Sequence, residues 1–182
     1  MLPAQTPEQA THCTMSPEER ALFALIVESA RQERTELRCS SKLQEFARMR
    51  ARDMVSRGYF SHVTPDRVGP NELLRESGYP LPSLYGDALA NSVEAIVGGY
   101  ADPDIVYSEL LASGSHRKHI LGEIGFFRNQ DEIGLAYVHS PDSDYEDYWV
   151  VVIARQERPD EPRYLCSPEP SFCFTMRKNK KK

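Results

Sequence analysis

Apolar residues recur at helical spacing in the first third of the chain. The segment Ser16–Glu19 has the features of a helix start: a serine cap, a proline at the first position and two acids in the first turn. Leu22, Leu25 and Ile26 then follow on one helical face. We therefore expect a helix that starts at this cap and runs to about Arg34.

A second amphipathic segment begins near Ser40 or Ser41. Arg50 and Met54 are among the residues of its inner face. Gly58 is expected to end this helix, because glycine accepts the left-handed conformation that closes many helices.

The middle of the chain alternates short elements with loops. Residues 70–77 have the pattern of a short helix, and the two prolines in 79–85 indicate a loop. Apolar residues in 88–97 have helical spacing, but the type of this element stays ambiguous. An Asp-Pro pair at 102–103 then caps a helix that ends at the Ser-Gly pair at 113–114.

The last third of the chain changes period. Residues 133–139 and 148–154 are rich in β-branched and aromatic residues, and a turn-forming cluster at 140–144 separates them. The apolar run at 150–153 is continuous, so we expect that strand to be covered on both faces. Helices first and an antiparallel hairpin later predict a layered α+β domain.

Length and charge limit the class of protein. The 182 residues fit one domain with tails, which we place as an N-terminal arm at 1–15, a domain at 16–156 and a C-terminal extension at 157–182. The net charge of −5 includes five positive charges within 177–182, so the rest of the chain carries −10. An acidic body with a short basic tail argues against nucleic-acid binding, which needs a basic face on the domain.

The chain shows no membrane-spanning segment and no leader. Its longest apolar run, Ala21–Val27, has seven residues, far short of the ~20 that a span needs. The first residues lack the basic and apolar regions of a signal peptide. The protein is therefore either cytosolic or a mature form whose leader has been removed.

The four cysteines favour the mature form of a secreted protein. Cys13, Cys39, Cys166 and Cys173 all lie in polar, irregular segments, which indicates disulfides and an oxidising compartment. Cys166 with Cys173 could close a small loop, and Cys13 with Cys39 would tie down the arm, but all three pairings remain open. A zinc site made of the four is the alternative, although no Cys-x2-Cys pair is present.

Two histidines and one glutamate are the candidate site residues. His62 and His116 each follow the end of a predicted helix, and Glu94 lies between them in the sequence. Either histidine alone could simply bond the last carbonyls of its helix. Together with Glu94 they could converge on one cleft.

The segments around both histidines resemble the signatures of a known family. Residues 48–54, Arg-Met-Arg-Ala-Arg-Asp-Met, lead into 58–66, Gly-Tyr-Phe-Ser-His-Val-Thr-Pro-Asp, and the second signature is Ser-Gly-Ser-His-Arg-Lys-His-Ile-Leu at 113–121. With the hairpin segments Ile-Gly-Leu-Ala-Tyr at 133–137 and Tyr-Trp at 148–149, they are similar to the bacterial branch of the CAP superfamily. That superfamily takes in cysteine-rich secretory proteins, antigen 5 and plant pathogenesis-related 1 proteins, and its domain is also called the SCP domain.

The resemblance implies a three-layer α-β-α sandwich with a central antiparallel sheet and a large cleft. In the family, two histidines and up to two glutamates line the cleft, and these map onto His62, His116 and Glu94. The chain departs from the pattern at Val93 and Ala95 beside Glu94, and the position of the second glutamate is Ser113. Leu110 also replaces a tryptophan, and a Thr-Gln pair after Trp149 is replaced by two valines. The cleft is therefore expected to hold at most three of the four groups.

These three residues have the donor types of a metal site. Two imidazoles, one carboxylate and a water would make an open tetrahedral site for zinc, which suits nitrogen donors better than calcium does. His119 is a candidate third ligand, although we expect it to be surface-exposed. His12, His139 and Glu109 are expected to face solvent. Two imidazoles more than about 7 Å apart with diverging nitrogens would exclude a shared zinc.

Two function classes remain open. The first is a secreted, periplasmic or cell-surface monomer whose cleft binds a metal ion, a small ligand, a lipid or a protein. The second is a metal-dependent or serine-type hydrolase, in which Ser61 or Ser115 would act with His62 or His116 and Glu94. We assign no catalytic residue, because a serine next to a histidine in sequence does not establish the hydrogen bond that catalysis needs.

Overall fold

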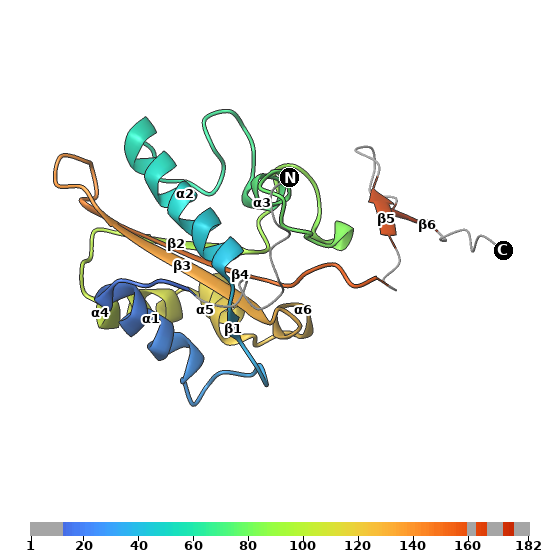
Figure 1. The fold of residues 1–182 in the computed structure, drawn as a ribbon, viewed down its shortest axis with the longest axis horizontal. Coiled ribbons are helices and arrows are strands. Elements are labelled where there is room, and N and C mark those ends of the chain that lie inside the picture. Colours follow the sequence, from blue (N-terminus) through green and yellow to red (C-terminus); the bar gives the residue numbers. More distant parts are fainter. Residues whose placement is uncertain (1–12, 160–162, 167–172, 177–182) are drawn as a thin grey trace, which may run out of the picture.

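A computed structural model describes residues 13–159, 163–166 and 173–176 of the chain. Three layers are evident in Figure 1, with helix α2 above a sheet and helices α1, α4 and α5 below it. The main sheet has the strand order β1-β3-β4-β2. Its strands are β1 (Arg38–Cys39), β2 (Glu94–Gly98), β3 (Glu132–His139) and β4 (Asp147–Ala154).

The helices agree with most of the expected elements. They are α1 (Pro17–Val27), α2 (Ser41–Arg57), α3 (Pro70–Glu76), α4 (Pro103–Ala112), α5 (Gly114–Leu121) and α6 (Gly125–Arg128), with a 3-10 turn η2 (Ser83–Tyr85). The predicted cap of α1 is present as a reciprocal pair of bonds between Ser16 and Glu19. Gly58 ends α2 in the left-handed conformation with a φ of 64°, as expected.

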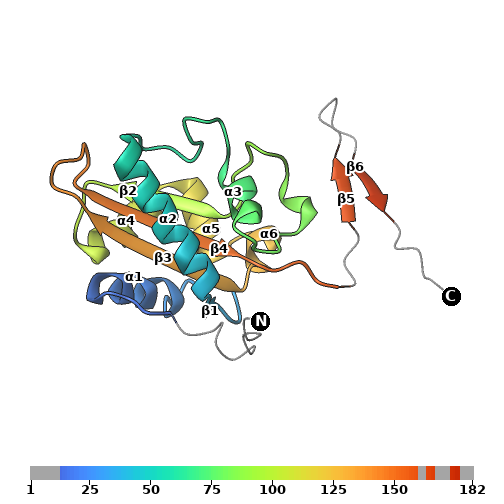
Figure 2. The ribbon, with the colours of Figure 1, turned by 45° about the horizontal axis from the view of Figure 1, so that its top comes forward.

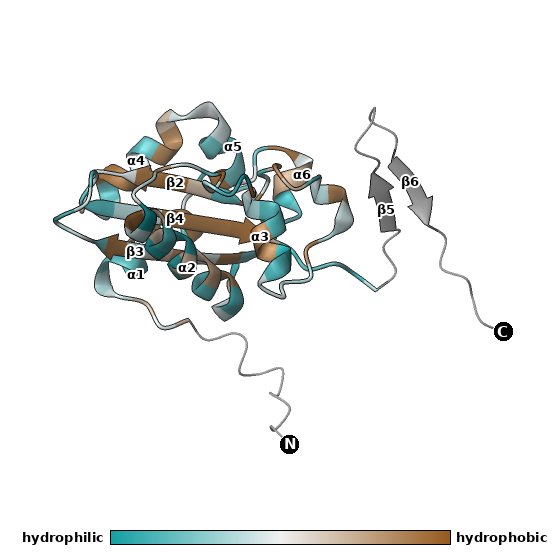
Figure 3. Cartoon of the chain, turned by 90° about the horizontal axis from the view of Figure 1, so that it is seen from above, coloured by the Kyte–Doolittle hydropathy of each residue, from teal (hydrophilic) through white to brown (hydrophobic). Residues whose placement is uncertain are grey.

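The central strand β4 contributes to two separate cores. Tyr148, Val150 and Val152 face α2, whereas Trp149 and Val151 face α1, α4 and α5. Successive side chains of a strand point to opposite faces, so the continuous apolar run buries residues on both sides. Figure 3 shows the same arrangement as brown strands between helices that carry hydrophilic faces. The predicted α+β, three-layer α-β-α fold is confirmed.

The first helix is shorter than predicted. It ends at Val27 and not near Arg34, because the segment after it makes other bonds. The guanidinium of Arg34 turns inward and donates to the carbonyl oxygens of His119 (2.6 Å), Ile120 (2.9 Å) and Gln130 (2.7 Å). Arg34 thus satisfies the last carbonyls of α5, which a helix cannot satisfy internally.

The ambiguous segment at 88–97 contains a strand. Its second half forms β2, which pairs antiparallel with β4 from Glu94 opposite Val152 to Gly98 opposite Tyr148. Pairing in the sheet overrides the helical spacing of the apolar residues, and Leu89, one of the residues that suggested a helix, is exposed. The sheet is antiparallel except at β1, which pairs parallel with β3.

A disulfide ties the N-terminal segment to β1. Cys13 and Cys39 are bonded, with their Cα atoms 6.1 Å apart, which selects among the pairings left open by the sequence. A bonded pair also removes these two thiols from any zinc site made of four cysteines. The strands β5 (Arg163–Cys166) and β6 (Cys173–Met176) form a second, two-stranded sheet, whose register places Cys166 opposite Cys173.

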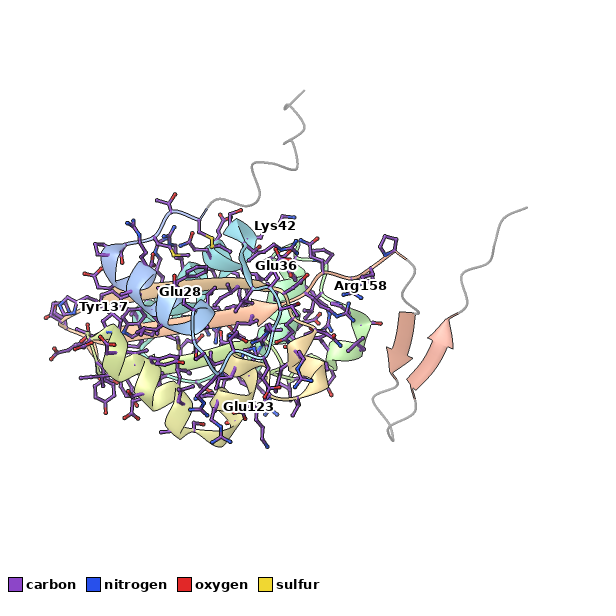
Figure 4. The ribbon with its side chains drawn as sticks, turned by 90° about the horizontal axis from the view of Figure 1, so that it is seen from below. Glu28, Glu36, Lys42, Glu123, Tyr137 and Arg158 are labelled. Atoms are coloured by element: carbon purple, nitrogen blue, oxygen red, sulfur yellow. A yellow bond between two sulfur atoms is a disulfide. The ribbon has the colours of Figure 1, made fainter. Side chains whose placement is uncertain are left out.

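The second sheet follows a segment that leaves the four-stranded sheet, and β5 lies near η2. Figure 2 shows β5 and β6 apart from the four-stranded sheet, and Arg158 lies on the segment that leads to them in Figure 4. The same view places Tyr137 toward the opposite end of the sheet. Its ring stacks on that of Trp149, with 4.5 Å between the ring centroids. Among the described residues, no helix is long and apolar enough to cross a membrane.

Gly134 allows α2 to lie directly on β3. A Cβ built at Gly134 would come within 2.1 Å of the backbone nitrogen of Gln44 and 2.2 Å of the carbonyl carbon of Leu43. Only a residue without a side chain fits this approach, because the obstructing atoms are backbone and cannot rotate away. The distance between the upper helix and the sheet is therefore set at this glycine.

We predict that Gly134→Ala lowers the free energy of unfolding by about 3 kcal/mol, because α2 must move off the sheet. Gly125→Ala is the matched control, since a Cβ at Gly125 meets nothing within 4 Å. Urea denaturation of both variants measures the difference. Equal midpoints in the two variants would contradict the close approach.

Candidate functional site

The site is built on a buried ion pair between α2 and β2. Arg50 Nε lies 2.8 Å from Glu94 Oε2, and both side chains are completely buried. Burial opposes the charge of Arg50, but the carboxylate of Glu94 and the hydroxyl of Tyr59 offset this effect and raise the pKa of Arg50. An arginine on the inner face of a helix is thus explained by a carboxylate on the facing strand.

The other donors of Arg50 hold the loop that follows α2. Its Nη2 donates to the carbonyl oxygens of Ser61 at 3.1 Å and His62 at 3.0 Å, and its Nη1 donates to the hydroxyl of Tyr59 at 2.6 Å. Tyr59 in turn donates to the carboxylate of Asp53. One guanidinium therefore fixes both the glutamate and the backbone that carries the first candidate histidine.

The start of β2 is held by a side chain as well. Asn91 Oδ1 accepts from the backbone nitrogen of Glu94 at 2.9 Å, and Asn91 Nδ2 donates to the carbonyl oxygen of Glu94 at 2.9 Å. The position of the glutamate therefore depends on this asparagine as well as on the sheet.

Glu94 orients His62. The Nδ1 atom of His62 lies 3.0 Å from Glu94 Oε1, and the His62 side chain is one-third exposed. A carboxylate only accepts hydrogen bonds, so Nδ1 carries the proton and Nε2 is the nitrogen left for other partners. The structure thus brings two of the predicted residues into direct contact.

His116 lies beside His62, on a helix that the sequence did not predict. It follows the end of α4 at Ala112, as expected, but it lies within the first turn of a further helix, α5. Ser113 caps α5 by accepting from the backbone nitrogen of His116. The imidazole rings of His62 and His116 lie 6.2 Å apart between centroids at an angle of 74°. Burial, and to a lesser degree the neighbouring His62, lower the pKa of His116.

His119 is buried, although the sequence predicts it at the surface. Only 5% of it is exposed, its Nε2 lies 3.3 Å from the carbonyl oxygen of Ile153, and its ring packs on Phe127 at 5.0 Å. Burial lowers the pKa of His119 to about 3. The signal in the sequence was its position in α5 just before Ile120 and Leu121, two core residues.

These groups line one small cavity of about 250 Å³. Its walls include His62, His116, His119, Glu94, Ser115 and Phe127. A larger hollow of about 740 Å³ lies over the outer face of α2, lined by residues such as Arg48 and Asp53. That hollow holds none of the three predicted site residues, so the histidine cavity is the candidate site.

Both serines of the hydrolase hypothesis have other partners. The hydroxyl oxygen of Ser61 accepts from the backbone nitrogen of Val63 at 3.2 Å, and the hydroxyls of Ser115 and Ser113 are 3.1 Å apart. In the part of the chain that the structure describes, neither serine is bonded to an imidazole. A Ser-His pair is therefore not preformed.

The donor set does not complete a zinc site. The distance between the two rings stays below the limit of about 7 Å, so it does not exclude a shared metal. Glu94, however, faces Arg50 and His62, and the described residues contain no group of three His, Cys, Asp or Glu side chains able to hold a metal. Zinc sites use at least three protein ligands, so we derive no step through a metal.

The remaining polar residues behave as expected where they are described. Glu109 is exposed, and the exposed side chain of His139 bonds Asp147 at 2.9 Å on the hairpin. His12 lies outside the described residues.

A family model places the chain among known proteins. The description "CAP: Cysteine-rich secretory protein family" matches residues 20–153, most of the chain. The chain therefore belongs to the CAP family, as its motifs indicated. It is also 28% identical over 104 residues to the uncharacterized protein YkwD of Bacillus subtilis (strain 168), covering 57% of this chain and 35% of that protein. The chain thus spans about a third of the length of this curated relative.

Two solved structures share the fold. An outer surface protein from Borrelia burgdorferi has a TM-score of 0.61 at 17% identity, over 80% of this chain and 97% of that one. An extracellular protein with an SCP domain from Bacillus anthracis str. Ames has a TM-score of 0.57 at 19% identity, over 85% and 45% of the two chains. At these identities the likeness concerns the fold alone.

We predict that Arg50→Met lowers the free energy of unfolding by about 3–5 kcal/mol, because Glu94 is then left buried without its partner. The exposed Arg52→Met is the matched control and changes stability by less than about 0.5 kcal/mol. Combining Arg50→Met with Glu94→Gln removes both charges and recovers part of the loss. Urea denaturation measures the free energy of unfolding of all three variants. If the Arg50→Met variant is as stable as the Arg52→Met variant, the buried ion pair is contradicted.

The low pKa of His119 predicts a loss of stability in acid. The unfolded chain binds a proton at His119 near pH 6.5, whereas the native state resists it until about pH 3. Between these values, the free energy of unfolding falls as the pH is lowered, by up to about 1.4 kcal/mol per pH unit. His119→Gln does not titrate, so its unfolding curves should show a shallower slope in this window. Identical slopes for the wild type and the variant would contradict the buried neutral histidine.

Proposed function

We propose that this chain is a secreted binding module, active as a monomer, whose cavity holds a small ligand between His62 and His116. The single observation that carries the proposal is the chain of contacts from Arg50 through Glu94 to His62. A buried ion pair is costly to desolvate, and apolar residues of similar size often stabilise a fold as well. Its use to orient a partly exposed imidazole in a cavity therefore favours a binding role over a purely structural one.

The cavity limits the size of the ligand. Its volume of about 250 Å³ is below the ~300–1,000 Å³ of pockets for drug-sized ligands. We therefore infer a small molecule or a single side chain of a protein partner, and not a lipid chain, as its occupant.

Secretion is supported by the disulfide and by the relatives. Disulfides such as Cys13–Cys39 persist in oxidising compartments. The two structural neighbours are an outer surface protein and an extracellular protein. We infer that this chain acts outside the cytoplasm as well.

Binding in the cavity can be tested with fragment-sized probes of several chemical classes. In ¹H–¹⁵N NMR spectra, at least one class should shift the amides of Ser92, Ser115 and His116. The double variant His62→Ala/His116→Ala should lose the response, and His139→Ala, outside the cavity, should keep it. If no probe changes the chemical shifts of the cavity amides, the proposal is contradicted.

Hydrolysis and zinc binding are the second candidates. The orientation of His62 by Glu94 is the arrangement of a general base, and the same arrangement also supports metal-binding histidines. A peptidase screen and zinc calorimetry on the wild type and the His62→Ala/His116→Ala variant separate these functions from binding alone. If peptidase activity survives the double substitution, this cavity is not its source. If the heat of zinc binding is the same for both proteins, the zinc hypothesis is excluded.

A further inference from the structure

The hydrogen bonds of the cavity histidines determine which of their nitrogens are acceptors. Nδ1 of His62 donates to Glu94, so the neutral ring presents the lone pair of Nε2. A carbonyl oxygen also only accepts, so Nε2 of His119 donates to Ile153 and leaves the lone pair on Nδ1. Each of these two rings therefore has one nitrogen that accepts a hydrogen bond. The bond made by the other nitrogen of the ring determines which one it is.

The charge around the cavity disfavours an anion. Apart from the three imidazoles, the one ionisable side chain among the described residues that line it is the carboxylate of Glu94. Two buried arginines lie near the cavity, but the bonds of both are directed elsewhere. Arg50 donates to Glu94, Tyr59 and two backbone carbonyls, and Arg34 donates to the carbonyl oxygens of His119, Ile120 and Gln130. Asp53 lies 3.7 Å from the guanidinium of Arg50, so two carboxylates share one positive charge.

The spacing of the rings distinguishes an ammonium from a zinc ion. Two imidazoles on one tetrahedral zinc have centroids about 5 Å apart, because each metal–nitrogen bond is only ~2.0–2.1 Å long. Two imidazoles that accept from one ammonium nitrogen have centroids about 6.5 Å apart, because each hydrogen bond is ~2.9 Å long. The observed 6.2 Å between His62 and His116 is closer to the second value.

We propose that the cavity recognises a primary ammonium group, which donates to His62 Nε2, His119 Nδ1 and the acceptor nitrogen of His116. An ammonium has three N–H donors and no acceptor, which matches three imidazole lone pairs. Phe127 also lines the cavity, and an aromatic ring attracts a cation held over its face. This inference rests on the proposed binding function and names the ligand class of the same cavity.

The test is a titration of the ¹⁵N-labelled full chain followed through the imidazole nitrogens. n-Butylammonium should produce saturable shifts at His62 Nε2 and His119 Nδ1, because both accept from it. Tetramethylammonium has the same charge but no N–H donor, and butyrate reverses the charge, so neither should produce these shifts. The proposal is overturned if tetramethylammonium produces the same shifts as n-butylammonium, or if butyrate produces saturable shifts. It is also overturned if Zn²⁺ shifts these nitrogens and n-butylammonium does not.

Variants connect the response to the cavity. His62→Phe removes one acceptor and should weaken n-butylammonium binding at least about ten-fold, whereas His139→Phe, on the hairpin, should leave it unchanged. If His62→Phe does not fold, His116→Phe gives the same comparison. Unchanged affinity in the folded cavity variant overturns the ammonium assignment.

Two further comparisons are needed. The first identifies the source of the ammonium group, and the second separates the ammonium inference from the proposed binding function. Nα-acetyl-lysine amide and glucosamine distinguish a lysine side chain from an amino sugar, and binding of either supports the ammonium class. If n-butylammonium fails but another probe class shifts the cavity amides, the ammonium inference is wrong and the binding function stands. If no class shifts them, both fail.

Discussion

The pairing of Arg50 with Glu94 is the interaction on which the candidate site depends. It joins the upper helix α2 to the edge strand β2 across the core, and both side chains are fully removed from water. Because the same guanidinium also bonds the carbonyl oxygens of Ser61 and His62, it couples the packing of the helix to the position of the loop. The orientation of His62 is therefore a consequence of how two layers of the fold meet.

The second layer contributes the other half of the cavity by different means. The helix α5 brings His116 and His119 to the cavity, and its last carbonyls are bonded by Arg34 from the segment after α1. Two buried arginines thus support the site, Arg50 through a carboxylate and Arg34 through helix carbonyls. The cavity lies where these two polar arrangements meet, in a domain whose remaining interior is largely apolar.

The candidate site was predicted in part. His62, Glu94 and His116 were identified from the motifs, and the structure brings them together. Arg50 was placed on the inner face of its helix, but its role depends on Glu94, 44 residues away, which helical periodicity cannot indicate. His119 was expected at the surface, because the contacts that bury it, with Phe127 and the carbonyl oxygen of Ile153, come from outside its own helix.

The sequence by itself determined the helix caps, the hairpin, the two-sided central strand and the family, because each depends on residues close together in the chain or on a linked set of motifs. Only the tertiary structure decided that α1 ends at Val27, that the segment before Gly98 is a strand and that Cys13 pairs with Cys39. It also decided that Glu94 is paired with Arg50. Each of these outcomes depends on a partner distant in sequence, and a buried polar group is stabilised by that partner and not by its neighbours in the chain.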